Sequence, residues 1–375
     1  MANEAIGING FGRVGQMVLR AALGKDAPVV AINSAEVEVD QMASMLQRDS
    51  THGGWRGTVK VDRGRLVVGG RSITVYQETT VGAIPWAKAG ARYIVETTGQ
   101  VTNEKEARAH LAPIVGGYKV LVTSPLPDLP ILIMGANEQQ YNPEWKLMSA
   151  GCATATCLAP LANLLHNKMG VAEVMVTALR GATEESRMVD GVAAGEDWRA
   201  GRGAGQNILP LALGTEDTLV RAVPGLEGRV GGLGLQVQSA AVCLLDITLR
   251  LEKEKTYEEV CAAVKKASDG SLGGVVGFTE SPLVSSDFLG DRRSAVVDFP
   301  SGQQLGPGMV KLVVWYDSET SFAARIIDLV LYIQAMDANR APSRESSIAS
   351  DNYASRSQTI ATLTVHLLNQ TWSNN

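Results

Sequence analysis

The sequence predicts a two-domain α/β protein whose first domain contains a doubly wound parallel sheet. Short apolar strand-like runs alternate with helix-like runs in the first half, and a glycine-rich loop joins the first strand to the first helix. From about residue 153 the strand-like runs become longer and fewer, which favours a separate α+β domain. We therefore expect domains at 1–152 and 153–338, followed by a polar tail at 339–375.

Composition limits the classes of function. The chain has 375 residues, 45% hydrophobic and 19% charged, with a formal net charge of -5. This balance is typical of a globular protein and does not favour nucleic-acid binding. The four cysteines are too scattered for a disulfide framework or a zinc site, so no metal is expected. No signal peptide or membrane span is apparent, and we expect a cytoplasmic protein.

The elements of the first half follow in order. Residues 4–10 (EAIGING) are expected to form a strand and residues 12–23 a helix, since Val14, Met17, Val18 and Ala22 share one side. Further short strands are expected at 28–33, 91–99, 119–125 and 131–137. The stretch 51–78 has closely spaced short strands with glycine turns, which indicates an antiparallel insertion.

In the second half, long strands are expected at 171–181, 233–253 and 309–317, with an amphipathic helix at 256–268. The glycine- and alanine-rich stretch 190–210 is expected to be an ordered surface loop. The tail begins with a polar Ser/Arg/Asn run. It ends in a segment where Ile360, Leu363, Leu367, Leu368 and Trp372 lie near helical spacing.

The loop Gly10-Phe11-Gly12-Arg13-Val14-Gly15 is the first chemical signal. It has the spacing G-x-G-x-x-G between a strand and a helix, where a dinucleotide pyrophosphate meets the helix N-terminus. A tight turn without a ligand is the alternative. The next strand should end in an acid that binds the ribose hydroxyls, yet Ser34 stands there. We expect NAD binding to be weak or absent, and NADP stays open because no carboxylate repels a 2′-phosphate.

Many ordered blocks resemble glyceraldehyde-3-phosphate dehydrogenase. The similarity runs from about Ala5 to about Asp337 through INGFGRVG, DSTHG, ETTGQVT, IMGAN, CLAPLA, DWRAGRGAGQNILP, LRLEK, VSSDF and VKLVVWYD. The resemblance implies a Rossmann-type first domain and a second domain with a mixed sheet and an S-shaped loop at about 183–207. It also implies a homotetramer.

The resemblance places the catalytic nucleophile at Ala153. The family motif Ser-Asn-Ala-Ser-Cys-Thr-Thr-Asn-Cys-Leu-Ala-Pro aligns without a gap with residues 149–160. Cys152 then lies one position early, and Cys157 matches the second cysteine, which is not the nucleophile. Alanine has no lone pair with which to attack an aldehyde.

The resemblance places the catalytic base at Arg180, which lies 27 residues after Ala153 as the family's histidine lies after its cysteine. Arginine does not accept a proton near neutral pH. Of the four histidines, His52, His110 and His166 have surface-like surroundings in the sequence and His366 lies in the tail. None of these histidines is expected to act as a substitute base.

Other site positions follow from the same resemblance. Those expected to contact a dinucleotide are Gly10, Phe11, Gly12, Arg13, Val14, Gly15, Ser34, Thr98, Gly99, Thr123 and Ser318. Ser318 replaces the family's nicotinamide-binding asparagine. Gln236 and Leu213 replace a phosphate-binding arginine and threonine, whereas Thr154, Thr183 and Gly214 remain from the substrate-phosphate contacts.

These replacements favour a pseudoenzyme that serves as a structural or interaction subunit. One alternative is an active dehydrogenase that uses the displaced Cys152 with NAD or NADP. A second alternative is a nucleotide-binding sensor without chemistry. Expected partners are further copies of the chain, as a tetramer, or an active paralogue. The tail 339–375 is expected either to bury its apolar segment against a protein partner or neighbouring subunit, or to be a disordered appendage.

Overall fold

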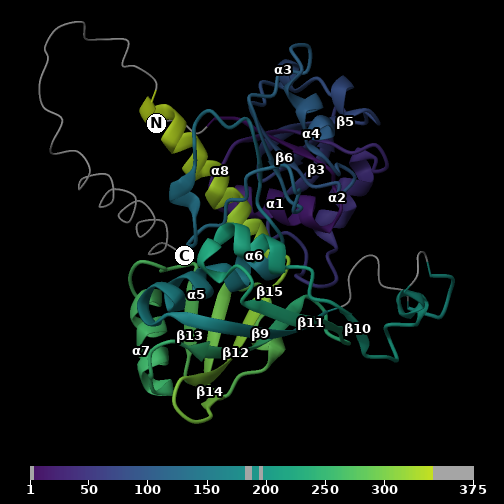
Figure 1. Ribbon diagram of the computed structural model, residues 1–375. Helices are drawn as coiled ribbons and strands as arrows, with labels where there is room; N and C mark the ends of the chain where they lie inside the picture. The colour runs from purple at the N-terminus through teal and green to yellow at the C-terminus, as the bar shows by residue number, and fades with distance from the viewer. Residues whose placement is uncertain (1–3, 182–187, 194–196, 341–375) are drawn as a thin grey trace, which may run out of the picture.

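The computed structural model describes residues 4–181, 188–193 and 197–340, which form two domains, each built on its own sheet (Figure 1). The strand order of the first sheet is β3-β4-β5-β2-β1-β6-β7-β8. Its strands are β1 (Ile6–Asn9), β2 (Val29–Asn33), β3 (Val59–Asp62), β4 (Arg65–Val68), β5 (Arg71–Tyr76), β6 (Tyr93–Glu96), β7 (Lys119–Val122) and β8 (Leu147–Ser149).

The first sheet confirms the predicted doubly wound arrangement. Strands β5, β2, β1, β6, β7 and β8 pair in parallel, and β3, β4 and β5 pair antiparallel as the predicted insertion. The order reverses at β1, so the loop after β1 lies where ligands of such sheets bind. The helices of this domain are α1 (Arg13–Gly24), α2 (Val39–Gln47), α3 (Trp86–Ala89) and α4 (Glu104–Arg108).

The second sheet has the order β10-β11-β9-β12-β15-β14-β13 and is mixed, because β11 pairs with β9 and β13 with β14 in parallel. Its strands are β9 (Val171–Arg180), β10 (Leu209–Ala212), β11 (Val230–Gln236), β12 (Val242–Leu251), β13 (Val276–Thr279), β14 (Ala295–Gln304) and β15 (Met309–Asp317). Three helices share one buried core with this sheet: α5 (Ala153–Met169), α6 (Glu216–Ala222) and α7 (Tyr257–Ser268).

Helix α8 (Thr320–Arg340) leaves the second domain and packs against the first (Figure 1). Its fully buried Ile326 and Ile327 share a core with Met17 and Val18 of α1. The expected boundary, 153–338, placed this helix with the second domain. The structure differs because the apolar side chains of α8 complete the core of the first.

The last turn of α8 is held by a buried polar cluster. Asp337 accepts hydrogen bonds from the hydroxyls of Tyr93 (2.8 Å) and Tyr141 (2.7 Å). The ammonium of Lys119, which is 1% exposed, lies 3.3 Å from Asp337 and donates to the Trp145 carbonyl at 2.8 Å. Each buried charge therefore has partners, as burial in a low-dielectric interior requires.

A second ionic network joins the glycine-rich loop to the corner between β15 and α8. Arg13 donates to Asp49 at 2.8 Å and to Glu319. His52 lies 2.7 Å from the Asp317 carboxylate, which has no exposed surface. Asp317 also accepts from the Thr320 amide at 2.8 Å, so the same carboxylate caps the start of α8.

None of the described helices has the length and apolar character needed to cross a bilayer.

The Asp317 carboxylate gives a test by pH. Burial alone raises its pKa, but hydrogen bonds from His52, Thr320 and Gly290 outweigh burial and hold the pKa below its usual range. A lowered folded-state pKa stabilises the protein above the unfolded pKa of about 4, and the contribution is lost as the pH falls through the folded value. Asp317→Asn should therefore lower the unfolding free energy by about 3–5 kcal/mol at neutral pH, and the difference should shrink below about pH 4.

Denaturant unfolding across pH measures this difference. The matched control is Asp246→Asn, because Asp246 forms a partly exposed ion pair with Lys311 and its loss should cost less than about 1 kcal/mol. A pH-independent difference between Asp317→Asn and the unchanged chain would contradict the assignment.

Candidate functional site

The glycine-rich loop has the geometry of a dinucleotide cradle. Gly10 has a φ of 101°, in the left-handed region. A Cβ on Gly15 would lie 2.2 Å from the Gly10 carbonyl oxygen, so only glycine permits this approach. Gly12 is the N-cap of α1, and no side chain caps the helix or places an acid in its first turn. The helix N-terminus is therefore free to receive an anion.

Beside the loop lies a cavity of about 420 Å³, lined by Gly12, Arg13, Gln16, Met45, Arg48, Asp49, Ser50, Thr51, Ala240 and Glu319. Phe11 is buried beneath the loop at 1% exposure, and Val14 is partly buried against the first core. The loop residues predicted from the sequence thus lie together, with Arg13 bound to the second domain.

Ser34 directly follows β2, as the sequence predicts for the ribose position. It is buried, and its amide donates to the Tyr76 carbonyl at 3.0 Å. Its neighbour Asn33 holds the backbone of Glu78 by two hydrogen bonds, of 2.9 and 3.1 Å. The side chain that follows β2 is therefore a neutral hydroxyl and carries no charge.

The turn after β6 is organised by a buried carboxylate that the sequence analysis did not single out. Glu96 accepts from the Thr98 hydroxyl (2.6 Å), from Asn9 beside the glycine loop (2.5 Å) and from His110 (2.9 Å). Burial raises the pKa of Glu96, but these donors reverse the shift and lower it. The signal in the sequence was an acid ending an otherwise apolar strand.

His110 has no exposed surface and accepts a 3.0 Å hydrogen bond from the Trp86 indole. The side chain of His52 is 5% exposed. The expectation of surface positions for these two histidines was therefore wrong, because each is paired with a buried carboxylate. Both histidines belong to the first domain, so neither is a second-domain residue of the site.

Two further predicted cofactor positions lie at the same edge of the sheet. Gly99 follows Thr98 with a φ of 69°, and the Thr123 hydroxyl after β7 donates to the Glu96 carbonyl at 3.0 Å. The hydroxyls of Thr98 and Thr123 are thus already engaged within the protein.

In the second domain, Ala153 is the first residue of α5 and Cys152 is its N-cap. The Cys152 thiol is half-buried and lies 3.1 Å from the Thr215 hydroxyl. Cys157 is fully buried, and burial raises the pKa of its thiol well above its usual value. Position 153 itself carries only a methyl group.

Arg180 ends β9, and its guanidinium donates to the carbonyl of Leu213. Gly214 follows with a φ of 65°. Thr154, the second residue of α5, lies 3.1 Å from the Tyr316 hydroxyl. Thr183 lies outside the described residues.

Ser318 lies between Asp317 and Glu319, at the corner between β15 and α8 where Glu319 binds Arg13. Its hydroxyl donates to the Ala241 carbonyl at 3.0 Å, and its amide donates to the same oxygen at 3.1 Å. The Ser318 side chain is therefore already hydrogen-bonded to the backbone of the second domain.

Of the replaced phosphate positions, Leu213 is 1% exposed in the second core and Gln236 is buried. Among the described residues no group of three or more histidine, cysteine or acidic side chains is arranged to hold a metal ion.

Comparisons with known proteins agree with this architecture. Residues 4–104 match the family model "Glyceraldehyde 3-phosphate dehydrogenase, NAD binding domain", and residues 151–318 match "Glyceraldehyde 3-phosphate dehydrogenase, C-terminal domain".

The chain is 42% identical over 335 residues to glyceraldehyde-3-phosphate dehydrogenase of Cochliobolus heterostrophus, covering 89% of this chain and 98% of the relative. It is 43% identical over 333 residues to that of Glossina morsitans morsitans, covering 89% and 99%. It is 41% identical over 338 residues to glyceraldehyde-3-phosphate dehydrogenase 1 of Schizosaccharomyces pombe, covering 90% and 100%. With both domain models and near-complete relatives matched, this chain belongs to the glyceraldehyde-3-phosphate dehydrogenase family.

Proposed function

We propose that this chain is a non-catalytic member of its family that serves as a structural or interaction subunit. The observation that carries the proposal is the pair Ala153 and Arg180, at the positions of the family's nucleophile and base. Oxidation of the aldehyde needs a thiolate to form a hemithioacetal and a base to take its proton before hydride leaves for nicotinamide. Neither residue supplies these groups.

The contacts around these residues support the proposal. Arg180 is bound to the Leu213 carbonyl, and Ser318 is bound to the Ala241 carbonyl. The side chains at these two family positions are therefore engaged with the protein's own backbone. The residues that match the family blocks are mainly glycines, apolar runs and the S-shaped loop.

An active enzyme that uses Cys152 is the second candidate. Cys152 is half-buried as the N-cap of a 17-residue helix, and its thiol lies 3.1 Å from the Thr215 hydroxyl. The relatives reported above are also named as dehydrogenases. Against it, Cys152 precedes the helix with extended backbone, so its side chain does not start from position 153, and attack geometry tolerates little displacement.

A nucleotide-binding sensor is the third candidate, favoured by the intact cradle of Gly10–Gly15 and by the match to an NAD-binding domain. Ser34 and Ser318 each give up a specific contact, at opposite ends of the dinucleotide. We therefore propose weak binding of NAD or NADP, or none.

For catalysis, the full chain should show no phosphate-dependent oxidation of glyceraldehyde-3-phosphate with NAD or NADP, measured by the absorbance of reduced nicotinamide. Ala153→Cys combined with Arg180→His should restore turnover, at about 10²–10⁴ times the rate of Ala153→Cys alone, because the base is restored as well. Cys152→Ser is the matched control and should change nothing. Turnover of the unchanged chain that disappears in Cys152→Ser would establish the second candidate instead.

For the cofactor, calorimetry should give a weak NAD affinity that Ser34→Asp and Ser318→Asn each raise. One hydrogen bond to a charged group is worth about one to two powers of ten in affinity, which sets the gain for Ser34→Asp; the gain for Ser318→Asn should be smaller, because an amide carries no charge. Ser271→Asp, at an exposed serine outside the site, is the control. A submicromolar dissociation constant for the unchanged chain would contradict the prediction.

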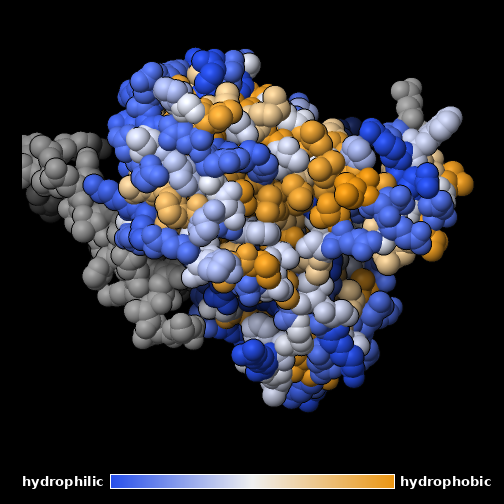
Figure 2. Space-filling view, turned by 90° about the horizontal axis from the view of Figure 1, so that it is seen from below, coloured by the Kyte–Doolittle hydropathy of each residue, from blue (hydrophilic) through white to orange (hydrophobic). Residues whose placement is uncertain are grey.

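The second domain also offers a surface for assembly. Its sheet buries one side against α5, α6 and α7, and its other side leaves Met175 60% and Leu233 42% exposed on β9 and β11. The loop before β10 adds Val192 and Trp198, which are 85% and 79% exposed. A broad apolar area is visible on the face seen from below (Figure 2). Such area on a monomer marks an interaction surface.

We therefore propose a homotetramer, with mixed assembly with an active paralogue as the alternative. Light scattering should give about four times the chain mass of 39.7 kDa. Met175→Glu combined with Leu233→Glu should lower the mass to that of smaller species, because it buries charge in the interface. Ile114→Glu, at an exposed apolar residue of the first domain, is the control. A monomeric unchanged chain would refute the proposal.

A further inference from the structure

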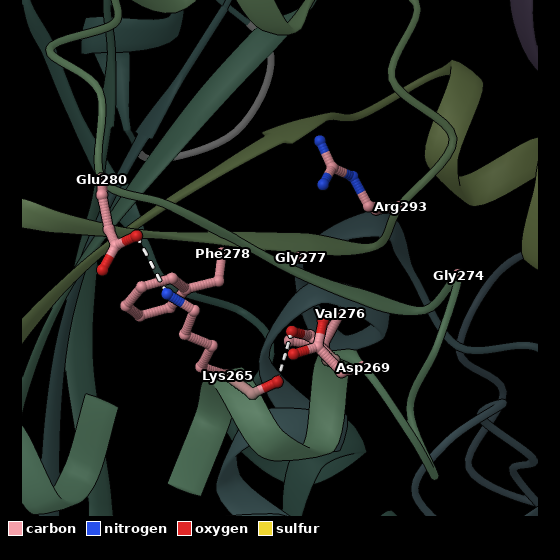
Figure 3. A pocket seen from close by; sticks show the side chains of 9 residues that line it. Lys265, Asp269, Gly274, Val276, Gly277, Phe278, Glu280 and Arg293 are labelled. Carbon is pink, nitrogen blue, oxygen red and sulfur yellow. Dashed lines mark hydrogen bonds and ion pairs between the residues drawn. The ribbon is translucent and has the colours of Figure 1, made fainter. Parts of the chain in front are cut away.

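A groove lies in the second domain, and its lining shares no residue with the site described above (Figure 3). It encloses about 450 Å³ and is lined by Lys265, Ser268, Asp269, Gly274, Val276, Gly277, Phe278, Glu280 and Arg293. One wall is thus the end of α7, and the floor is β13.

Strand β13 is an outer strand of its sheet. It pairs in parallel with β14 on one side, and no described strand pairs with the other. The amide of Val276 donates to the Leu272 carbonyl at 2.9 Å, so the unpaired part begins after it. An open strand edge presents backbone donors and acceptors that can pair with another extended segment.

The two cations that line the groove are each paired with a carboxylate. Lys265 lies 2.9 Å from Glu280 and 5.5 Å from the centre of the Phe278 ring. Arg293 forms a 2.5 Å ion pair with Asp291. The Phe278 ring and the Lys265 methylenes offer apolar surface, as the close view shows (Figure 3). The groove therefore suits a neutral segment with apolar side chains on one side.

Residues 361–367 of the tail have that pattern. Apolar Ala361, Leu363, Val365 and Leu367 alternate with polar Thr362, Thr364 and His366. Alternation with a period of two, rich in threonine and valine, is typical of a strand with one buried side. The helical spacing noted in the sequence analysis is the competing interpretation of the same segment.

The segment is tethered within reach of the groove. Arg325 of α8 donates to the carbonyl of Gly274, a groove residue, at 2.7 Å. Arg340 lies fifteen residues further along the same helix, about 22 Å away. The twenty residues 341–360 can span up to about 66 Å when extended.

We propose that residues 361–367 add as a strand to the free edge of β13 in the same chain. The alternate apolar side chains would cover Phe278, and the new strand would close the sheet edge. The inference is independent of the proposed function, because it involves neither the cofactor loop nor the nucleophile position. It also removes an open edge through which copies of the chain would otherwise aggregate.

Hydrogen exchange read by mass spectrometry tests this in the full chain, compared with a chain ending at Arg340. Peptides covering 276–280 should exchange at least about tenfold more slowly in the full chain. Thr364→Pro should abolish the protection, because proline lacks the amide donor. Ser347→Pro, in the tether, is the matched control and should keep it.

Equal exchange in all four proteins would overturn the proposal. So would protection that grows with protein concentration, since this would assign the docked segment to a second copy. The proposal is supported if the protection does not depend on protein concentration and if Thr364→Pro loses it while Ser347→Pro keeps it.

Discussion

The return of α8 to the first domain is the constraint on which the rest of the structure depends. The first core is built from both ends of the described chain, since Ile326 and Ile327 of α8 pack with Met17 and Val18 of α1. The second domain is thereby an insertion between β8 and α8. The position of the second domain relative to the glycine-rich loop is fixed by the two points at which the chain passes between the domains and by the polar contacts at each end of α8.

Ionic contacts hold the glycine-rich loop against the corner between β15 and α8. Arg13 belongs to the glycine-rich loop, yet its guanidinium is bound to Asp49 and Glu319. His52 and Asp317 add a buried pair beside it. Asp317 and Glu319, at the corner between β15 and α8, thus bind residues of the first domain, whereas Asp49 binds Arg13 within that domain. Ala153, the first residue of α5, packs beside both cores, and Arg180 donates to the Leu213 carbonyl.

The sequence predicted those parts of the fold that depend on local pattern. The strand–loop–helix at Gly10–Gly15, the antiparallel insertion and the long strands β9 and β15 follow from periodicity and glycine spacing. The strand expected at 233–253 is instead divided between β11 and β12, and the strand expected at 131–137 is only an isolated bridge at Ile131. The packing of α8 was not predictable in this way, because its apolar face could pack against either core. Only the topology of the chain determines that it packs against the first. The burial of His110 was missed for a similar reason. Its partners Glu96 and Trp86 are 14 and 24 residues away in the chain, and no local pattern connects them.

The placement of α8 also has a consequence for the order of synthesis. Domains commonly fold as units, the N-terminal one first, as the chain emerges from the ribosome. Here the first domain lacks a helix of its core until residues 320–340 have been made. The second domain, from α5 to β15, is continuous and is complete earlier. The later-made domain can therefore finish folding before the earlier-made one, whose α1 face stays uncovered until α8 has been made.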